Sequence, residues 1–188
     1  HFQFNELNIK AAPIIATLGY NDEEIPEPFN SYLNSAFRFA ENLDSICASL
    51  RIIDKVELLN ESGELVIENT HFKIGKTLLK ELKYSERVAV YICTAGPEIS
   101  NLSKELMFGE DPVKGFIYDI LGSYIAEKTG DKIEEFLRNE FKSTNKKFTA
   151  RYAPGYVEWP VDEQKKLFKP FHRIEGVGVE GQGLHVAL

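Results

Sequence analysis

The sequence is poor in the residues that build disulfide-rich proteins and metal centres. It has two cysteines and four histidines among 188 residues, and neither type recurs at the short spacing of metal ligands. Cys47 and Cys93 lie among apolar neighbours, which predicts reduced core thiols rather than a disulfide framework. The first ten residues lack the pattern of a secretory signal. The sequence therefore predicts a cytoplasmic protein without a metal site.

An excess of positive charge and long apolar runs are lacking as well. Twenty-two Lys and Arg residues stand against 29 Asp and Glu, and the net charge of -7 gives no general attraction to nucleic-acid phosphates or anionic lipids. The apolar run at 88–93 is only strand-sized, whereas a bilayer-spanning helix needs roughly 20 apolar residues. We therefore expect no nucleic-acid or membrane partner.

The chain also lacks a G-x-S-x-G elbow and a recognisable cysteine-nucleophile signature, so it offers no protein nucleophile.

The chain does contain enough apolar residues for one substantial core. At 188 residues and 43% hydrophobic content, we expect a single domain over residues 1–188. Residue spacing and turn signals predict local elements along the first half of the chain. These are an amphipathic helix over 29–50, a hairpin formed by 51–60 and 64–68, a short helix from Gly75 to Leu82, an interior strand at 88–93 and a helix that begins at Pro97.

The second half is dominated by one long helix, predicted from Pro112 to about Phe141. Its expected apolar stripe comprises Val113, Phe116, Ile117, Ile120, Leu121, Tyr124, Ile133, Phe136, Leu137 and Phe141. A strand at 148–153, a Pro/Gly turn and a short helix over 161–168 follow. Helices and strands do not alternate regularly, which favours an α+β fold. We expect a mainly antiparallel sheet packed with several helices, including one long central helix.

A G-x-G-x-x-G pattern occurs near the end of the sequence, at Gly176, Gly178 and Gly181. The dinucleotide-binding fingerprint needs a helix after the glycines and an acidic residue about 20 positions further on. Only seven residues follow Gly181 in this sequence. We therefore interpret the pattern as a turn or a flexible strand edge rather than a nucleotide site.

Glu127 falls on the apolar side of the long helix, because positions 113, 117, 120, 124 and 127 follow one another at three- and four-residue spacing. One interpretation is that the stripe rotates outward there, which leaves Glu127 solvated near the helix-weakening Gly130. The other is that its carboxylate faces a pocket and awaits a cationic ligand or partner. The sequence leaves both open.

Residues 151–156, with the sequence RYAPGY, form the most specific motif. The Arg151 guanidinium suits bidentate recognition of a carboxylate, and Tyr156 supplies an aromatic wall. Pro154 and Gly155 force a tight turn of exposed backbone. These groups meet the needs of a zwitterionic amino acid attached to a flat base. An ordinary surface turn, with Arg151 in a surface ion pair, remains the alternative on residue types alone.

The motif resembles the S-adenosylmethionine-binding motif of the activation domain of cobalamin-dependent methionine synthase. The match is complete at Arg151, Ala153, Pro154, Gly155 and Tyr156. Residues 92–98 and 115–138 are similar to the strand, T-x-G-P-E turn and long helix of that family, and residues 157–168 resemble its stand-alone bacterial form. The resemblance covers roughly residues 15 to 170.

This resemblance implies a role for each matching residue. Arg151 would engage the ligand carboxylate, Glu127 would face its amino group, and the backbone of residues 153–156 would receive adenine and ribose. The implied cofactor is S-adenosylmethionine. Cobalamin is implied only through a partner protein, since the chain lacks the D-x-H-x-x-G pattern with which one class of corrinoid domain binds cobalt. A flavodoxin-type reductant is the other implied partner.

Three functions follow as hypotheses. The first is a non-catalytic accessory subunit that reactivates a separate methionine synthase or corrinoid methyltransferase. The second is a ligand-free interaction module that docks on a corrinoid protein, because the sequence departs from the family after Phe168. The third is an unrelated enzyme that acts on a small amino acid through Glu127 as general base.

Overall fold

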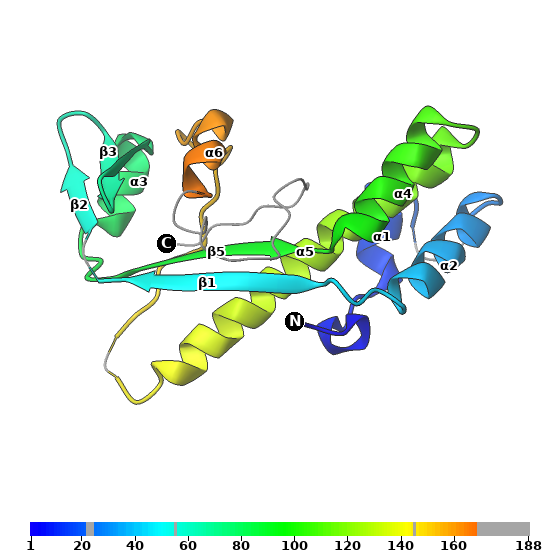
Figure 1. Cartoon of the computed structure of the whole chain (residues 1–188), viewed down its shortest axis with the longest axis horizontal. Coiled ribbons are helices and arrows are strands. Elements are labelled where there is room, and N and C mark those ends of the chain that lie inside the picture. Colours follow the sequence, from blue (N-terminus) through cyan, green and yellow to red (C-terminus); the bar gives the residue numbers. More distant parts are fainter. Residues whose placement is uncertain (22–24, 55, 145, 169–188) are drawn as a thin grey trace. The chain divides into compact units, whose positions relative to one another are not determined.

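The computed structural model describes residues 1–21, 25–54, 56–144 and 146–168. The G-x-G-x-x-G pattern lies outside these residues. The described residues form two compact units: the first comprises residues 1–48 and 93–134, and the second comprises residues 49–92 and 135–168. Both helices and antiparallel strands are present, as an α+β fold requires (Figure 1). None of the helices in the described ranges is both long and apolar enough to cross a membrane.

The first unit is built from helices. They are η1 (Phe4–Leu7), α1 (Ala11–Thr17), α2 (Phe29–Ala40), α4 (Pro97–Phe108) and the larger part of α5 (Pro112–Glu140). Their apolar faces share one core that includes Ile14, Leu33, Ala36, Ile99 and Leu121. α4 begins with Pro97 in its first turn, as predicted, because a proline there loses no helical hydrogen bond.

The helix predicted over 29–50 is shorter than expected. α2 ends at Ala40, and Cys47–Ile53 forms the strand β1. The intervening residues 41–46 include asparagine, aspartate and serine, whose side chains favour turns over helix interiors. β1 pairs with β5 (Val88–Thr94), and the two strands run in opposite directions (Figure 1). The apolar run at 88–93 is therefore a strand, as predicted, but within the described residues β1 is its only sheet neighbour, so the predicted interior position is wrong.

The second unit contains a three-stranded antiparallel sheet in the order β2-β3-β4. Its strands are β2 (Val56–Leu59), β3 (Glu64–Ile67) and β4 (Thr70–Lys73). The predicted hairpin is confirmed as β2 and β3, with Val56 opposite Ile67 and Leu59 opposite Glu64, but residues 51–53 of its predicted first arm belong to β1. The helix α3 (Gly75–Leu82) also lies where it was predicted. Leu65, Phe72, Leu78 and Trp159 belong to the core of this unit.

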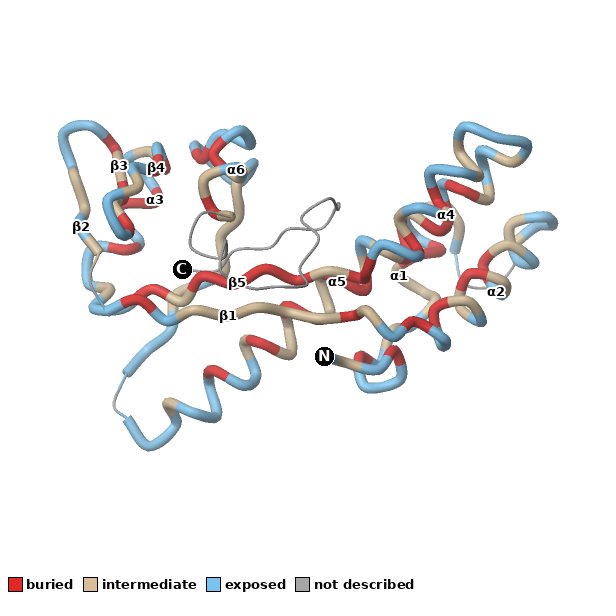
Figure 2. The backbone as a smooth tube through the Cα atoms, viewed as in Figure 1, coloured by how far each residue is buried: buried red, intermediate tan, exposed pale blue. Residues whose placement is uncertain are grey.

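The long helix is confirmed as α5, but its buried side differs from the predicted stripe. Buried positions recur every four residues at Ile117, Leu121, Ile125, Thr129, Ile133 and Leu137 (Figure 2). Val113, Phe116 and Phe136 are instead 44%, 48% and 51% exposed. The stripe was wrong at these three positions because apolar residues stand on more than one side of the helix. Only packing against its neighbours selects which side is buried.

The strand predicted at 148–153 is wrong, since these residues form no regular element. A strand needs a hydrogen-bonded neighbour, which the local pattern of aromatic and β-branched residues does not supply. Phe148 instead meets Phe141 edge-to-face at 6.0 Å between ring centroids, and Tyr152 packs against the core of the second unit. The turn at 154–157 and the short helices η2 (Val161–Glu163) and α6 (Gln164–Leu167) follow, as predicted.

Candidate functional site

Residues 151–156 lie in the second unit and end in a tight turn. The Tyr156 amide donates a 3.0 Å hydrogen bond to the Ala153 carbonyl, which closes a four-residue turn. The Gly155 amide donates to the Trp159 carbonyl at 2.8 Å, and the Trp159 amide donates to the Tyr156 carbonyl at 2.9 Å. Three backbone hydrogen bonds among residues 153–159 therefore fix the conformation at the end of the motif.

Two residues, one in this turn and one directly after it, adopt left-handed backbone conformations. Gly155 has φ +95°, and a Cβ atom there would lie 3.1 Å from Val161 Cγ2. Glycine at this position thus avoids both backbone strain and a close contact. Val157 has φ 52°, which is unfavourable for a β-branched residue, and its side chain is 64% exposed. The surrounding hydrogen bonds hold Val157 in that conformation.

Trp159 anchors the turn to the second unit. Its side chain is 1% exposed and belongs to the core there. The indole Nε1 has no hydrogen-bond partner among the described residues. Burial of the large ring contributes apolar contacts that offset the cost of an unpaired N–H group. The motif is therefore tied to the core by the residue that follows it.

Glu158 provides a second anchor, on the helix α3. Its Oε2 atom accepts a 3.0 Å hydrogen bond from the Thr77 amide at the start of that helix. Hydrogen bonds from Thr77 and Lys76, together with the positive charge of Lys80, lower the pKa of the Glu158 carboxyl. A Cβ atom on Gly75 would lie 2.4 Å from Glu158 Cβ, so this close approach requires glycine.

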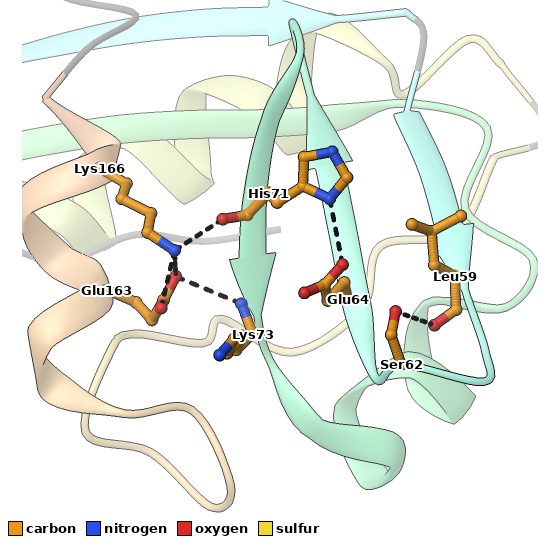
Figure 3. A network of polar contacts seen from close by, with 7 residues as sticks. All are labelled: Leu59, Ser62, Glu64, His71, Lys73, Glu163 and Lys166. Atoms are coloured by element: carbon orange, nitrogen blue, oxygen red, sulfur yellow. Dashed lines mark hydrogen bonds and ion pairs between the residues drawn. The ribbon is translucent and has the colours of Figure 1, made fainter.

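A third attachment follows the turn, where η2 and α6 meet the edge of β4. Glu163 is 8% exposed, and its carboxylate accepts a 3.2 Å hydrogen bond from the Lys73 amide (Figure 3). Lys166 donates to the Glu163 carboxylate and to the His71 carbonyl, both at 2.8 Å. On the same sheet, a 3.0 Å hydrogen bond from His71 Nδ1 lowers the pKa of the Glu64 carboxyl. These contacts cover the β4 edge of the sheet.

The side chains of the motif differ in their exposure. Arg151 is half-buried, and Tyr156 is 60% exposed. Tyr152 lies between them in the sequence, and its ring meets that of Tyr156 at 6.4 Å between centroids. Burial raises the pKa of the Tyr152 hydroxyl, and the charge of Glu81 adds to the effect. The motif thus presents an accessible tyrosine face beside a tyrosine that is packed into the core.

Glu127, the other predicted ligand-binding residue, lies in the first unit on α5. It is half-buried, on the side of the helix that carries Ile120 and Tyr124 rather than on the line of Ile125 and Thr129. The pKa of the neighbouring Lys128 is raised, chiefly by its 2.8 Å hydrogen bond to Asp131 and further by the charge of Glu127. A shared ligand for Glu127 and Arg151 stays a prediction.

The cysteines and acidic residues add no further centre within the described residues. Cys93 is buried, Cys47 is half-buried, and neither forms a disulfide. Burial raises the pKa of the Cys47 thiol, which keeps it in the less reactive protonated form. Nowhere in the ranges described do three His, Cys, Asp or Glu side chains gather in a way that could hold a metal ion.

The residues that hold the motif in place were not predicted from the sequence. Trp159 and Glu158 follow the turn directly, and Trp159 is the only tryptophan in the chain, which is a signal that could have identified the anchor. The contact of Glu163 with β4 joins residues 90 positions apart and has no local signal.

A scan against protein-family models found no match, and a search of curated proteins found none either.

Proposed function

We propose that the chain is an accessory protein that binds S-adenosylmethionine and supports the reductive remethylation of cobalamin in a separate methionine synthase or corrinoid methyltransferase. The proposal rests on the resemblance of residues 151–156 to the activation-domain motif. The single structural observation in its favour is the fixed turn, which combines a left-handed Gly155, an exposed Tyr156 and a half-buried Arg151.

The chemistry of these residues suits the proposed ligand. Arg151 can donate two parallel hydrogen bonds to the carboxylate, and Glu127 can accept from the amino group. The amides of Gly155 and Tyr156 are already bonded within the turn, so we expect the adenine amino group to be received by backbone carbonyls of residues 153–156. Tyr156 offers its ring to a flat base.

The protein's own contribution in this proposal is to position the ligand. S-adenosylmethionine supplies the methyl group when it is bound. The cobalamin and a flavodoxin-type reductant come from partner proteins, and the proposed location is the cytoplasm. In this proposal the subunit has no turnover of its own, and the chemistry belongs to the ligand and to the partner proteins.

Calorimetric titration of S-adenosylmethionine into the native chain and into Arg151→Ala tests this proposal. We expect saturable binding to the native chain that is at least about tenfold weaker in the variant, or ~1.4 kcal/mol. Arg51→Ala is the matched control, because Arg51 lies in the same unit and forms a surface ion pair with Glu68 at 2.6 Å. The control should bind like the native chain.

A folded native chain that gives neither heat nor a thermal shift at millimolar S-adenosylmethionine would contradict the proposal. The ligand-free interaction module would then be the better account. Binding of the chain to a cobalamin-loaded methionine synthase, in the absence of S-adenosylmethionine, would support that alternative directly.

A further inference from the structure

The second unit contains a cleft that the proposed function does not use. It has a volume of about 360 Å³. It lies between the turn after α3, the beginning of β5, the end of α5 and residues 146–149. This volume is at the lower end of the range for ligand clefts, which suits one small molecule better than a segment of a partner protein.

Apolar side chains form the walls of the cleft. Leu137 and Phe141 come from the end of α5, and Ile52 comes from β1. Phe148 closes one side, where its edge-to-face contact with Phe141 and the Arg138 guanidinium, 5.3 Å from the ring centroid, fix its position. Ile52 and Phe148 are still 42% and 39% exposed. An apolar ligand group would therefore remove further apolar surface from water.

Five charged residues also line the cleft, and ion pairs neutralise three of them. Lys146 pairs with Glu86, and Arg87 pairs with Asp54 at 2.7 Å. The remaining two are Glu81 on α3 and Lys147 in the segment of residues 146–149. Both are exposed, and neither forms an ion pair with any residue in the described ranges. One carboxylate and one ammonium group are thus available at the same apolar cleft.

We propose that this cleft binds a free α-amino acid with an apolar side chain. Glu81 would pair with the ammonium group, Lys147 with the carboxylate, and the side chain would contact the walls near Phe148. A simple anion would be repelled by Glu81 and a simple cation by Lys147, whereas a zwitterion satisfies both charges. The site uses neither Arg151 nor Glu127, so it is separate from the function proposed above.

Titration calorimetry with L-phenylalanine as the probe tests the inference. Both charges are exposed, so each ion pair with the ligand contributes little, and we expect weak binding with a dissociation constant on the order of 1 mM. Glu81→Gln and Lys147→Gln should each weaken L-phenylalanine binding by about tenfold. Glu61→Gln and Lys142→Gln remove the same charges from exposed positions elsewhere in the second unit, and these controls should bind like the native chain.

Two analogues assign each charge to its partner. Phenylacetate lacks the ammonium group, so its weaker binding should not fall further in Glu81→Gln. Phenethylamine lacks the carboxylate, so its weaker binding should not fall further in Lys147→Gln, which removes a like charge. This pattern distinguishes direct pairing from a general effect of the substitutions on folding.

The inference would be overturned if the folded native chain did not bind L-phenylalanine at a ligand concentration tenfold above the expected dissociation constant of ~1 mM. Equal losses in the control variants would also overturn it. Arg151→Ala should retain L-phenylalanine binding while it loses S-adenosylmethionine, so the two sites can fail separately. Loss of L-phenylalanine binding in Arg151→Ala would contradict a separate site.

Discussion

Val157 shows how the turn after the motif is held against a local preference. Its φ of 52° is one that residues other than glycine, asparagine and aspartate rarely adopt. Its side chain is 64% exposed, so burial of that side chain does not account for the conformation. The hydrogen bonds of Gly155, Tyr156 and Trp159 enforce it instead.

We expect Val157→Asn to raise the free energy of unfolding by about 1 kcal/mol. Asparagine tolerates the left-handed region, so the substitution relieves strain without the larger chain entropy of a glycine in the unfolded state. Urea denaturation monitored by Trp159 fluorescence measures the change. Val113→Asn, at another half-exposed valine, serves as the control and should give no gain. A loss of stability in Val157→Asn would show that the turn is not strained.

The predicted residues of the motif could be selected from the sequence because their chemistry is local. An arginine followed closely by Pro154, Gly155 and an aromatic residue predicts a turn, and the turn is present. The exposure of Tyr156 and the partial burial of Tyr152 could not be predicted, because both depend on where the core of the second unit lies. The half-buried position of Glu127 likewise could not be predicted, because it depends on how α5 packs.

At the scale of elements, α3 depends on a residue more than 80 positions away. Its first turn receives the Glu158 carboxylate, which accepts from the Thr77 amide at 3.0 Å. The negative charge also interacts favourably with the N-terminal end of the helix. Gly75 permits this approach, because a larger residue would meet Glu158. Glu158, which comes directly after the turn at 154–157, and the helix α3 therefore stabilise each other.

We expect Glu158→Gln to destabilise the protein at neutral pH but not in acid. The pKa of Glu158 is lowered in the folded chain, so its contribution is present above the ordinary carboxyl pKa of roughly 4.3 and is lost as the pH falls through the lower folded value. The difference in unfolding free energy between native and variant should therefore shrink below about pH 4. Urea denaturation at a series of pH values measures it.

Asp162→Asn is the control for this experiment, since it removes a carboxylate from an exposed position in the neighbouring η2. Its difference from the native chain should not follow the same course with pH. If it does, the pH dependence belongs to the net charge of the protein rather than to the contact between Glu158 and α3.

Most element types could be predicted from the sequence, and each of the two exceptions has its own cause. α3, α4, α5, β5 and the hairpin of β2 and β3 were predicted, because periodicity and start signals are properties of neighbouring residues. The end of α2 was wrong because apolar spacing continued into β1. The strand at 148–153 was wrong because strand formation requires a partner.

At the scale of the whole molecule, the described residues form two units that share elements. β1, β5 and α5 each begin in one unit and end in the other. Most helical residues belong to the first unit, whereas Trp159, the only tryptophan, belongs to the second. Circular dichroism and tryptophan fluorescence therefore observe different parts of the chain.

We expect the two signals to change together in urea. β1, β5 and α5 continue from one unit into the other, so unfolding of one unit leaves the part of each element in the other unit without its continuation, which favours a single cooperative transition. Coincident midpoints in far-UV circular dichroism and Trp159 fluorescence would support the predicted single domain over residues 1–188. Two clearly separated midpoints would instead show that the units are independent domains.

The α+β class, the long helix and the turn at Pro154 and Gly155 could be predicted without the structure, because these depend on residues that are close along the chain. Only the tertiary structure decided which side of α5 is buried and that residues 148–153 form no strand. The same holds for Glu81 and Lys147, which line one cleft although 66 positions separate them. Their meeting depends on packing between distant segments, for which no local pattern exists.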